Sequence, residues 1–129
     1  VPVVVEHLAG VSTPSADPAI EAARLRAFEL ARFPNVSLKL PGLGEFCSRA
    51  MPPTSPYPFV DRAPAALDAA YTAFGPDRLL WGSDYPPVSG REGYGNALHW
   101  PRTLLAEKGE AALARIFGGN AAAIFRLPG

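Results

Sequence analysis

Four side chains that can bind ligands or transfer protons lie in, or directly after, short apolar runs of this sequence: Glu6, His7, Lys39 and Asp84. A carboxylate such as Asp84 can act as a general base or a metal ligand, and a neutral imidazole such as His7 can move a proton or bind a metal. Three of them also have a plainer interpretation. His7 would then be a hydrogen-bonded histidine at a strand end, Asp84 a turn residue, and Lys39 a charge that reaches to the edge of a sheet. Residue type alone leaves these alternatives open.

Further candidates lie in loops and in a later helix. Arg91 and Tyr94 follow the third apolar run, where they can close over a bound anion. Cys47 has no neighbouring histidine in the sequence, which disfavours a catalytic thiol. His99 is expected to be a packing or surface residue. The glycines from 90 to 95 lack the pattern of a phosphate-binding loop.

The elements that must position these residues follow from apolar runs and turn signals. Continuous β-branched and apolar runs predict three strands, and apolar spacing predicts helices between and after them. The expected strands are 3–5, 36–40 and 78–82, and the expected helices are 19–32, 58–74, 97–108, 110–117 and 121–125. Asp17 and Pro18 form a helix start, residues 118–119 are expected to cap the end of a helix, and Asn120 is expected to cap the last helical turn.

Alternation of strands and helices predicts an α/β fold with a parallel sheet. Ligands of such folds bind at the carboxyl ends of the strands, where the polar candidates lie. We therefore expect the side chains of Asp84 and His7 to share a cleft, within roughly 8 Å of each other. If strand geometry persists past residue 5, Glu6 and His7 point to opposite faces of the sheet.

Composition limits the class of protein. The 129 residues carry 12 lysines and arginines and 12 aspartates and glutamates, which gives no electrostatic case for binding nucleic acid or an anionic membrane. One cysteine excludes an internal disulfide framework, and no run approaches about 18 consecutive apolar residues. We expect a cytoplasmic protein. Because three parallel strands leave an apolar face and two edges uncovered, we also expect the chain to be part of a longer polypeptide.

Four blocks of the sequence resemble the C-terminal part of the amidohydrolase-related family, in the branch of 2-pyrone-4,6-dicarboxylate lactonase-like and sugar-lactonase-like hydrolases. They read VVVEHL from residue 3, PNVSLKLPG from 34, FGPDRLLWGSDYP from 74 and IFGGNAA from 116. The blocks follow the family's order across nearly the whole chain. WGSDYP followed by FGGNAA is the specific signal.

The resemblance implies a fold and an activity. The blocks are similar to strands 6, 7 and 8 of a (β/α)₈ TIM barrel, so residues 1–129 would be the C-terminal portion of one barrel domain. Asp84 matches the aspartate after the last strand, which activates the attacking water and can ligate a metal. His7 matches a strand-end histidine, although Glu6 stands where Asp is common and Pro41 where Ser is common. The implied reaction is hydrolysis of a lactone or a related cyclic ester or amide.

The sequence departs from the family in its metal ligands. The family's first strand carries a His-x-His pair, whereas this chain has two histidines far apart, His7 and His99. Only His7 and Asp84 can reach one metal, so the chain alone implies no cofactor. A divalent metal such as zinc remains open for the full-length parent, in which other residues would complete the site.

The implied partner is a small molecule, either a lactone or a carboxylated ring compound, with Lys39, Arg91 and Tyr94 as expected substrate contacts. Two alternatives stay open. One is a decarboxylase of the same barrel type. The other is a non-catalytic, truncated or half-barrel module that self-associates or binds a missing N-terminal half.

Overall fold

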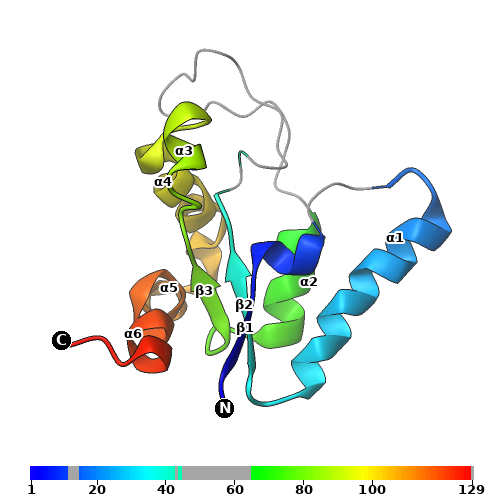
Figure 1. Ribbon diagram of the computed structural model, residues 1–129, viewed down its shortest axis with the longest axis horizontal. Helices are drawn as coiled ribbons and strands as arrows, with labels where there is room; N and C mark the ends of the chain where they lie inside the picture. Colours follow the sequence, from blue (N-terminus) through cyan, green and yellow to red (C-terminus); the bar gives the residue numbers. More distant parts are fainter. Residues whose placement is uncertain (12–14, 43, 45–64, 129) are drawn as a thin grey trace.

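A three-stranded parallel sheet organises the chain in this computed structural model, which describes residues 1–11, 15–42, 44 and 65–128. The strands β1 (Val3–Val5), β2 (Val36–Leu40) and β3 (Leu79–Trp81) lie in the order β1-β2-β3. Val5 pairs with Leu38, and Leu38 pairs with Leu79. The predicted α/β class, with parallel strands, is confirmed (Figure 1).

Helical segments separate and follow the strands. The described helices and turns are η1 (His7–Gly10), α1 (Pro18–Leu25), η2 (Arg26–Arg32), α2 (Ala65–Phe74), α3 (Pro87–Gly90), α4 (Tyr94–Leu104), η4 (Ala106–Lys108), α5 (Glu110–Ala114), η5 (Arg115–Gly119) and α6 (Asn120–Phe125). In Figure 1, α1 and α2 lie on one side of the strands, and α5 and α6 lie beyond β3. The crossovers that a parallel sheet requires are therefore helical.

The first predicted helix is divided into two parts. Its start is confirmed, because Asp17 Oδ1 accepts hydrogen bonds from the backbone N–H groups of Ala19 at 2.8 Å and Ile20 at 3.4 Å. From residue 26 the chain continues as the 3₁₀ segment η2. The predicted helix 58–74 lies within the described residues only from Ala65 onward.

The glycine pair before Asn120 interrupts the helical chain where the sequence predicts it. Residues 115–119 form a π-helical turn. Gly118 breaks the helical backbone with φ of 173° and ψ of −48°, which is an extended φ and not the left-handed conformation of a common C-cap. The Asn120 side chain, by contrast, does not cap α6. Its Nδ2 donates to the carbonyls of Pro76 and Leu79, both at 2.7 Å, and so ties the C-terminal helix to β3. The prediction that Asn120 caps the last helical turn was wrong, because its side chain binds carbonyls of the segment around β3 instead.

The core lies on one face of the sheet. The buried strand residues Leu38, Leu40 and Leu79 pack against the helical segments on this face. The buried residues of those segments include Leu67 and Phe74 of α2, Trp100 of α4 and Ile116 of the π-helical turn. Phe28 of η2 meets Phe74 edge to face, with ring centroids 6.4 Å apart. The helices thus cover the face carrying Leu38 and Leu40, while the alternate residues Ser37 and Lys39 point to the other face.

Candidate active site

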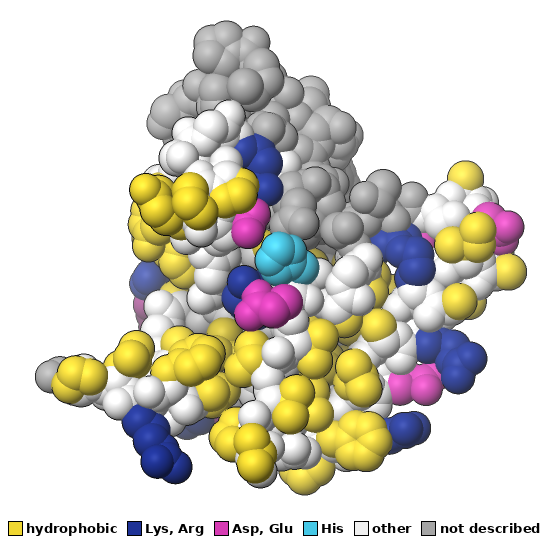
Figure 2. All heavy atoms as spheres, viewed as in Figure 1, with side chains coloured by type: hydrophobic (Ala, Val, Ile, Leu, Met, Phe, Trp, Pro, Cys, Tyr) yellow, Lys and Arg dark blue, Asp and Glu magenta, His cyan; other side chains and the backbone are white. Residues whose placement is uncertain are grey.

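Ionisable side chains meet where the three strands end. The structure brings together six of them from β1, β2, β3 and the loop after α3: Glu6, His7, Lys39, Asp84, Arg91 and Glu92. Figure 2 shows histidine, acidic and basic side chains gathered together on this face of the molecule. This is the edge of the sheet at which a parallel fold binds its ligands.

His7 and Asp84 face each other across the sheet. Their atoms Nε2 and Oδ1 are 3.7 Å apart, which confirms the expected proximity. The His7 side chain is 39% exposed and the Asp84 side chain 18%, so a small molecule can reach the pair from solvent. An imidazole and a carboxylate at this separation can contact the same water or the same substrate atom.

The backbone after β1 explains where Glu6 and His7 point. His7, Leu8 and Ala9 have φ values of 49°, 51° and 58°, in the left-handed region that non-glycine residues rarely adopt. Strand alternation therefore ends before His7. The condition for opposite faces, strand geometry that persists past residue 5, is therefore not met, and Glu6 Oε2 lies 3.9 Å from His7 Nε2.

Asp84 also has a left-handed backbone, with φ of 60°, and the Tyr85–Pro86 peptide that follows is cis. The turn-residue interpretation describes its backbone, because the Asp84 carbonyl accepts a hydrogen bond from the Val88 N–H at 3.1 Å. The turn-residue interpretation does not account for the carboxylate, because the Asp84 side chain does not cap the helix α3 that follows. Non-glycine residues held in this conformation cost on the order of 1–3 kcal/mol and cluster at functional sites.

Arg91 links two carboxylates. Its Nη1 is 3.1 Å from Asp84 Oδ2, and its Nε donates to Glu92 Oε2 at 2.7 Å. Burial acts to lower the pKa of Arg91, but its hydrogen bonds and ion pairs with Glu92 and Asp84 outweigh burial and raise that pKa above its usual value. Arg91 therefore remains cationic and holds one oxygen of Asp84, which leaves the other directed at His7.

Lys39 pairs with Glu6 at the carboxyl ends of β2 and β1. Its aliphatic stem runs close over Gly82, where an added Cβ would lie 2.8 Å from Lys39 Cδ. Because β2 is the central strand, Lys39 does not extend past an outer edge of the sheet. It reaches along the strand ends to a carboxylate beside His7.

The remaining candidates lie apart from this cluster or outside the described residues. Tyr94 begins α4, and its exposed ring meets Trp81 edge to face at 5.8 Å. His99 is exposed, and its Nε2 is 3.4 Å from Thr103 Oγ1 on the same helix. Cys47 lies outside the described residues.

Glu92 is the residue that sequence reasoning missed. It stands beside Arg91 in a glycine-rich segment and looks like an ordinary loop charge, yet its side chain is 0% exposed. Its hydrogen bond from the Gly44 N–H, at 3.1 Å, joins segments far apart in the sequence. No local pattern reveals that contact.

The described residues do not provide a complete zinc site. Over residues 1–11, 15–42, 44 and 65–128, no three His, Cys, Asp or Glu side chains come together as a metal-binding group. A catalytic zinc ordinarily has three protein ligands, whereas His7 and Asp84 supply two donors at most. These residues alone therefore do not fit the metal.

The fold and the site define this chain as an α/β protein with parallel strands and a polar site at their carboxyl ends. Comparison with known proteins then identifies the family. A profile described as Amidohydrolase matches residues 1–127. The chain belongs to the amidohydrolase family.

Two curated relatives carry the same name. The chain is 36% identical to an L-fucono-1,5-lactonase of Burkholderia ambifaria, an alignment covering 97% of this chain and 41% of the relative. It is 34% identical to an L-fucono-1,5-lactonase of Burkholderia multivorans, covering 87% of this chain and 38% of the relative. The chain thus spans about two-fifths of the length of these relatives.

Solved structures show the same fold. An amidohydrolase from Burkholderia multivorans with bound zinc superposes with a TM-score of 0.74 at 29% identity, covering 98% of this chain and 44% of that one. A second structure from the same organism, with bound HEPES, gives a TM-score of 0.75 at 26% identity, covering 98% of this chain and 45% of that one.

Within the described part of the chain, no helix has the length and apolar character needed to cross a membrane.

Proposed function

We propose that this chain forms the C-terminal portion of an amidohydrolase barrel, with β1, β2 and β3 as strands 6, 7 and 8 and residues 1–129 as part of a single domain. The proposal is supported by parallel strands in consecutive order and by solved amidohydrolases that the chain covers to 44–45%. Three of eight strand units is a similar share of a barrel.

The complete barrel would hydrolyse the lactone of a sugar acid. The support is the name of the two relatives at 36% and 34% identity, together with a carboxylate–imidazole pair at the strand ends. In this mechanism Asp84 Oδ1 accepts a proton from water as the water attacks the lactone carbonyl. His7 donates a hydrogen bond to the substrate or relays the proton to the leaving alkoxide.

The neighbouring charges would serve the same reaction. Arg91 holds Asp84 Oδ2, so the second oxygen stays available to water. Lys39 and Arg91 would contact substrate oxygens through N–H donors that their ion pairs leave unused, since a lysine has three donors and an arginine five. Tyr94 would contact substrate through its exposed ring. A metal, if the full-length parent holds one, would need further ligands in addition to His7 and Asp84.

The observation that carries the proposal is the division of the Asp84 carboxylate. One oxygen lies 3.1 Å from Arg91 Nη1, and the other lies 3.7 Å from His7 Nε2. Arg91 thus holds the carboxylate in place through one oxygen, while the second oxygen lies beside the His7 imidazole, where a small molecule can reach it from solvent.

The test is Asp84→Asn in the full-length protein, assayed with L-fucono-1,5-lactone. Asparagine tolerates the left-handed backbone, so the variant removes the base without adding strain. We expect kcat to fall by about 100-fold or more, because the amide cannot take the proton of water. His99→Gln, on the exposed face of α4, is the matched control and should keep full activity. Full activity in Asp84→Asn would refute the general-base role.

The same protein should also be assayed for release of CO₂ from a carboxylated ring compound. CO₂ release without lactone hydrolysis would favour the decarboxylase alternative. Neither activity would favour the non-catalytic module.

A further inference from the structure

Glu92 is a buried carboxylate to which the proposed reaction assigns no step. Its side chain is 0% exposed, and no other acidic residue in the described part of the chain is buried. A carboxylate removed from water is costly unless charges and hydrogen bonds compensate it. Here Arg91 Nε donates at 2.7 Å, Arg91 Nη2 at 3.4 Å and the Gly44 N–H at 3.1 Å.

Two glycines leave the space that this carboxylate occupies. A Cβ at Gly42 would lie 2.7 Å from Glu92 Oε1 and 3.0 Å from the Ser83 carbonyl. A Cβ at Gly44 would come closer still to Glu92 Oε2. Neither glycine has a positive φ, so close approach to Glu92, not backbone freedom, explains the small residue at both positions.

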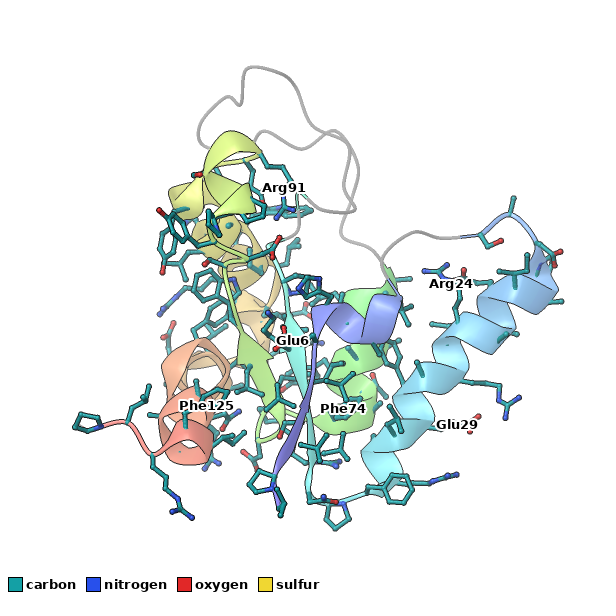
Figure 3. The ribbon with its side chains drawn as sticks, in the orientation of Figure 1. Glu6, Arg24, Glu29, Phe74, Arg91 and Phe125 are labelled. Atoms are coloured by element: carbon teal, nitrogen blue, oxygen red, sulfur yellow. The ribbon has the colours of Figure 1, made fainter. Side chains whose placement is uncertain are left out.

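The guanidinium of Arg91 is divided between two carboxylates. One side, formed by Nε and Nη2, faces Glu92, and Nη1 reaches Asp84 Oδ2. Figure 3 shows Arg91 extending from the segment after α3 toward the strand ends. Arginine–carboxylate pairs are frequently bidentate, with two parallel N–H donors that engage both oxygens. In this protein Glu92 accepts hydrogen bonds from one such pair of donors, Nε and Nη2 of Arg91.

We propose that Glu92 is a positioning residue that holds Arg91 in a one-oxygen contact with Asp84. By binding Nε and Nη2, it fixes the orientation of the guanidinium, so that Nη1 alone reaches Asp84, at one oxygen. Asp84 Oδ1 then stays directed at His7, 3.7 Å away, and remains available to water. The catalytic consequence rests on the proposed function, whereas the arrangement of Arg91 stands on the geometry itself.

The first measurement is kinetic and uses the full-length protein with L-fucono-1,5-lactone. Glu92→Gln keeps the size of the side chain and an acceptor for the Gly44 N–H but removes the charge. We expect kcat to fall between about 10-fold and 100-fold, the effect of a small displacement of a catalytic group, with KM changing less than twofold. In an Arg91→Lys background the same change should lower kcat less than twofold, because a lysine has no fork to redirect.

Matched variants separate positioning from folding. Glu29→Gln, an exposed glutamate on η2, should leave kcat and KM unchanged. Glu92→Asp keeps the charge but withdraws it by one methylene, so it should lower kcat as Glu92→Gln does. If Glu92→Gln lowers kcat equally in the parent protein and in the Arg91→Lys background, the proposal is overturned.

The second measurement does not depend on catalysis. In ¹⁵N spectra of the full-length protein, the Nε–H of Arg91 should exchange slowly with solvent, because Glu92 holds it in a buried hydrogen bond. Slow exchange should be lost in Glu92→Gln and retained in Asp84→Asn. If the signal is unchanged in Glu92→Gln, the positioning role is refuted. If the protein does not hydrolyse the lactone, the proposed function fails, and this spectrum alone decides the role of Glu92.

Discussion

Replacing Asn120 by alanine tests how the C-terminal helix is attached to the sheet. Asn120 is 8% exposed, and its Nδ2 donates to the carbonyls of Pro76 and Leu79, both at 2.7 Å. Each such hydrogen bond contributes about 0.5–1.5 kcal/mol net, so the loss of two amounts to roughly 1–3 kcal/mol. Alanine recovers a few tenths of a kcal/mol through its higher helix propensity. We expect the free energy of unfolding to fall by about 2 kcal/mol.

The assay is urea unfolding of the full-length protein, followed by circular dichroism. Asn35→Ala is the matched control, because it removes one exposed hydrogen bond, from Asn35 Nδ2 to the Val1 carbonyl at 3.0 Å. That change should cost less than about 0.5 kcal/mol. Asn120→Asp should destabilise at least as strongly as Asn120→Ala, since a carboxylate would face two carbonyl oxygens without a donor. If Asn120→Ala and Asn35→Ala have equal effects, the attachment argument is wrong.

Three further predictions concern packing, capping and assembly. Gly42→Ala should lower kcat for the lactone about as much as Glu92→Gln, because its Cβ would lie 2.7 Å from Glu92 Oε1; unchanged kcat would contradict this. Asp17→Ala should reduce the free energy of unfolding by about 1 kcal/mol through loss of two N-cap hydrogen bonds, whereas Asp17→Asn should cost little. Residues 1–129 expressed alone should self-associate or lack fixed packing in size-exclusion chromatography and near-UV circular dichroism, because Val3, Ile20 and Phe33 are 44%, 52% and 42% exposed. A monomer with a sharp cooperative melt would contradict that expectation.

The strands could be predicted because apolar runs and helical spacing are local signals, whereas their order in the sheet was implied only by the family resemblance. Val36–Leu40 reads as a buried strand, and it is the central one. Asp17 before Pro18 reads as a helix start, and its side chain caps α1. Both features depend on residues close in sequence, which is where pattern reasoning is effective.

The missed features depend on contacts between distant segments or on unusual backbone angles. Glu6 and His7 lie on one side because His7 adopts a positive φ, which its residue type does not demand. Asn120 binds carbonyls of Pro76 and Leu79 instead of capping its own helix. Buried Glu92 accepts a hydrogen bond from the Gly44 N–H, which lies 48 positions earlier in the sequence. In each case tertiary structure overrides the local preference of the residue.

The parallel pairing of the strands also limits the order and the speed with which this sheet can fold. Val5 pairs with Leu38, and Leu38 pairs with Leu79, so each ladder joins segments separated by a helical crossover and neither can begin as a hairpin. Closing such long loops costs chain entropy before the contacts return stability, which slows folding. The fully buried Leu38 takes part in both pairings. During synthesis the β1–β2 pairing must therefore wait for β2, and the other edge of β2 stays unpaired until β3 has been synthesised.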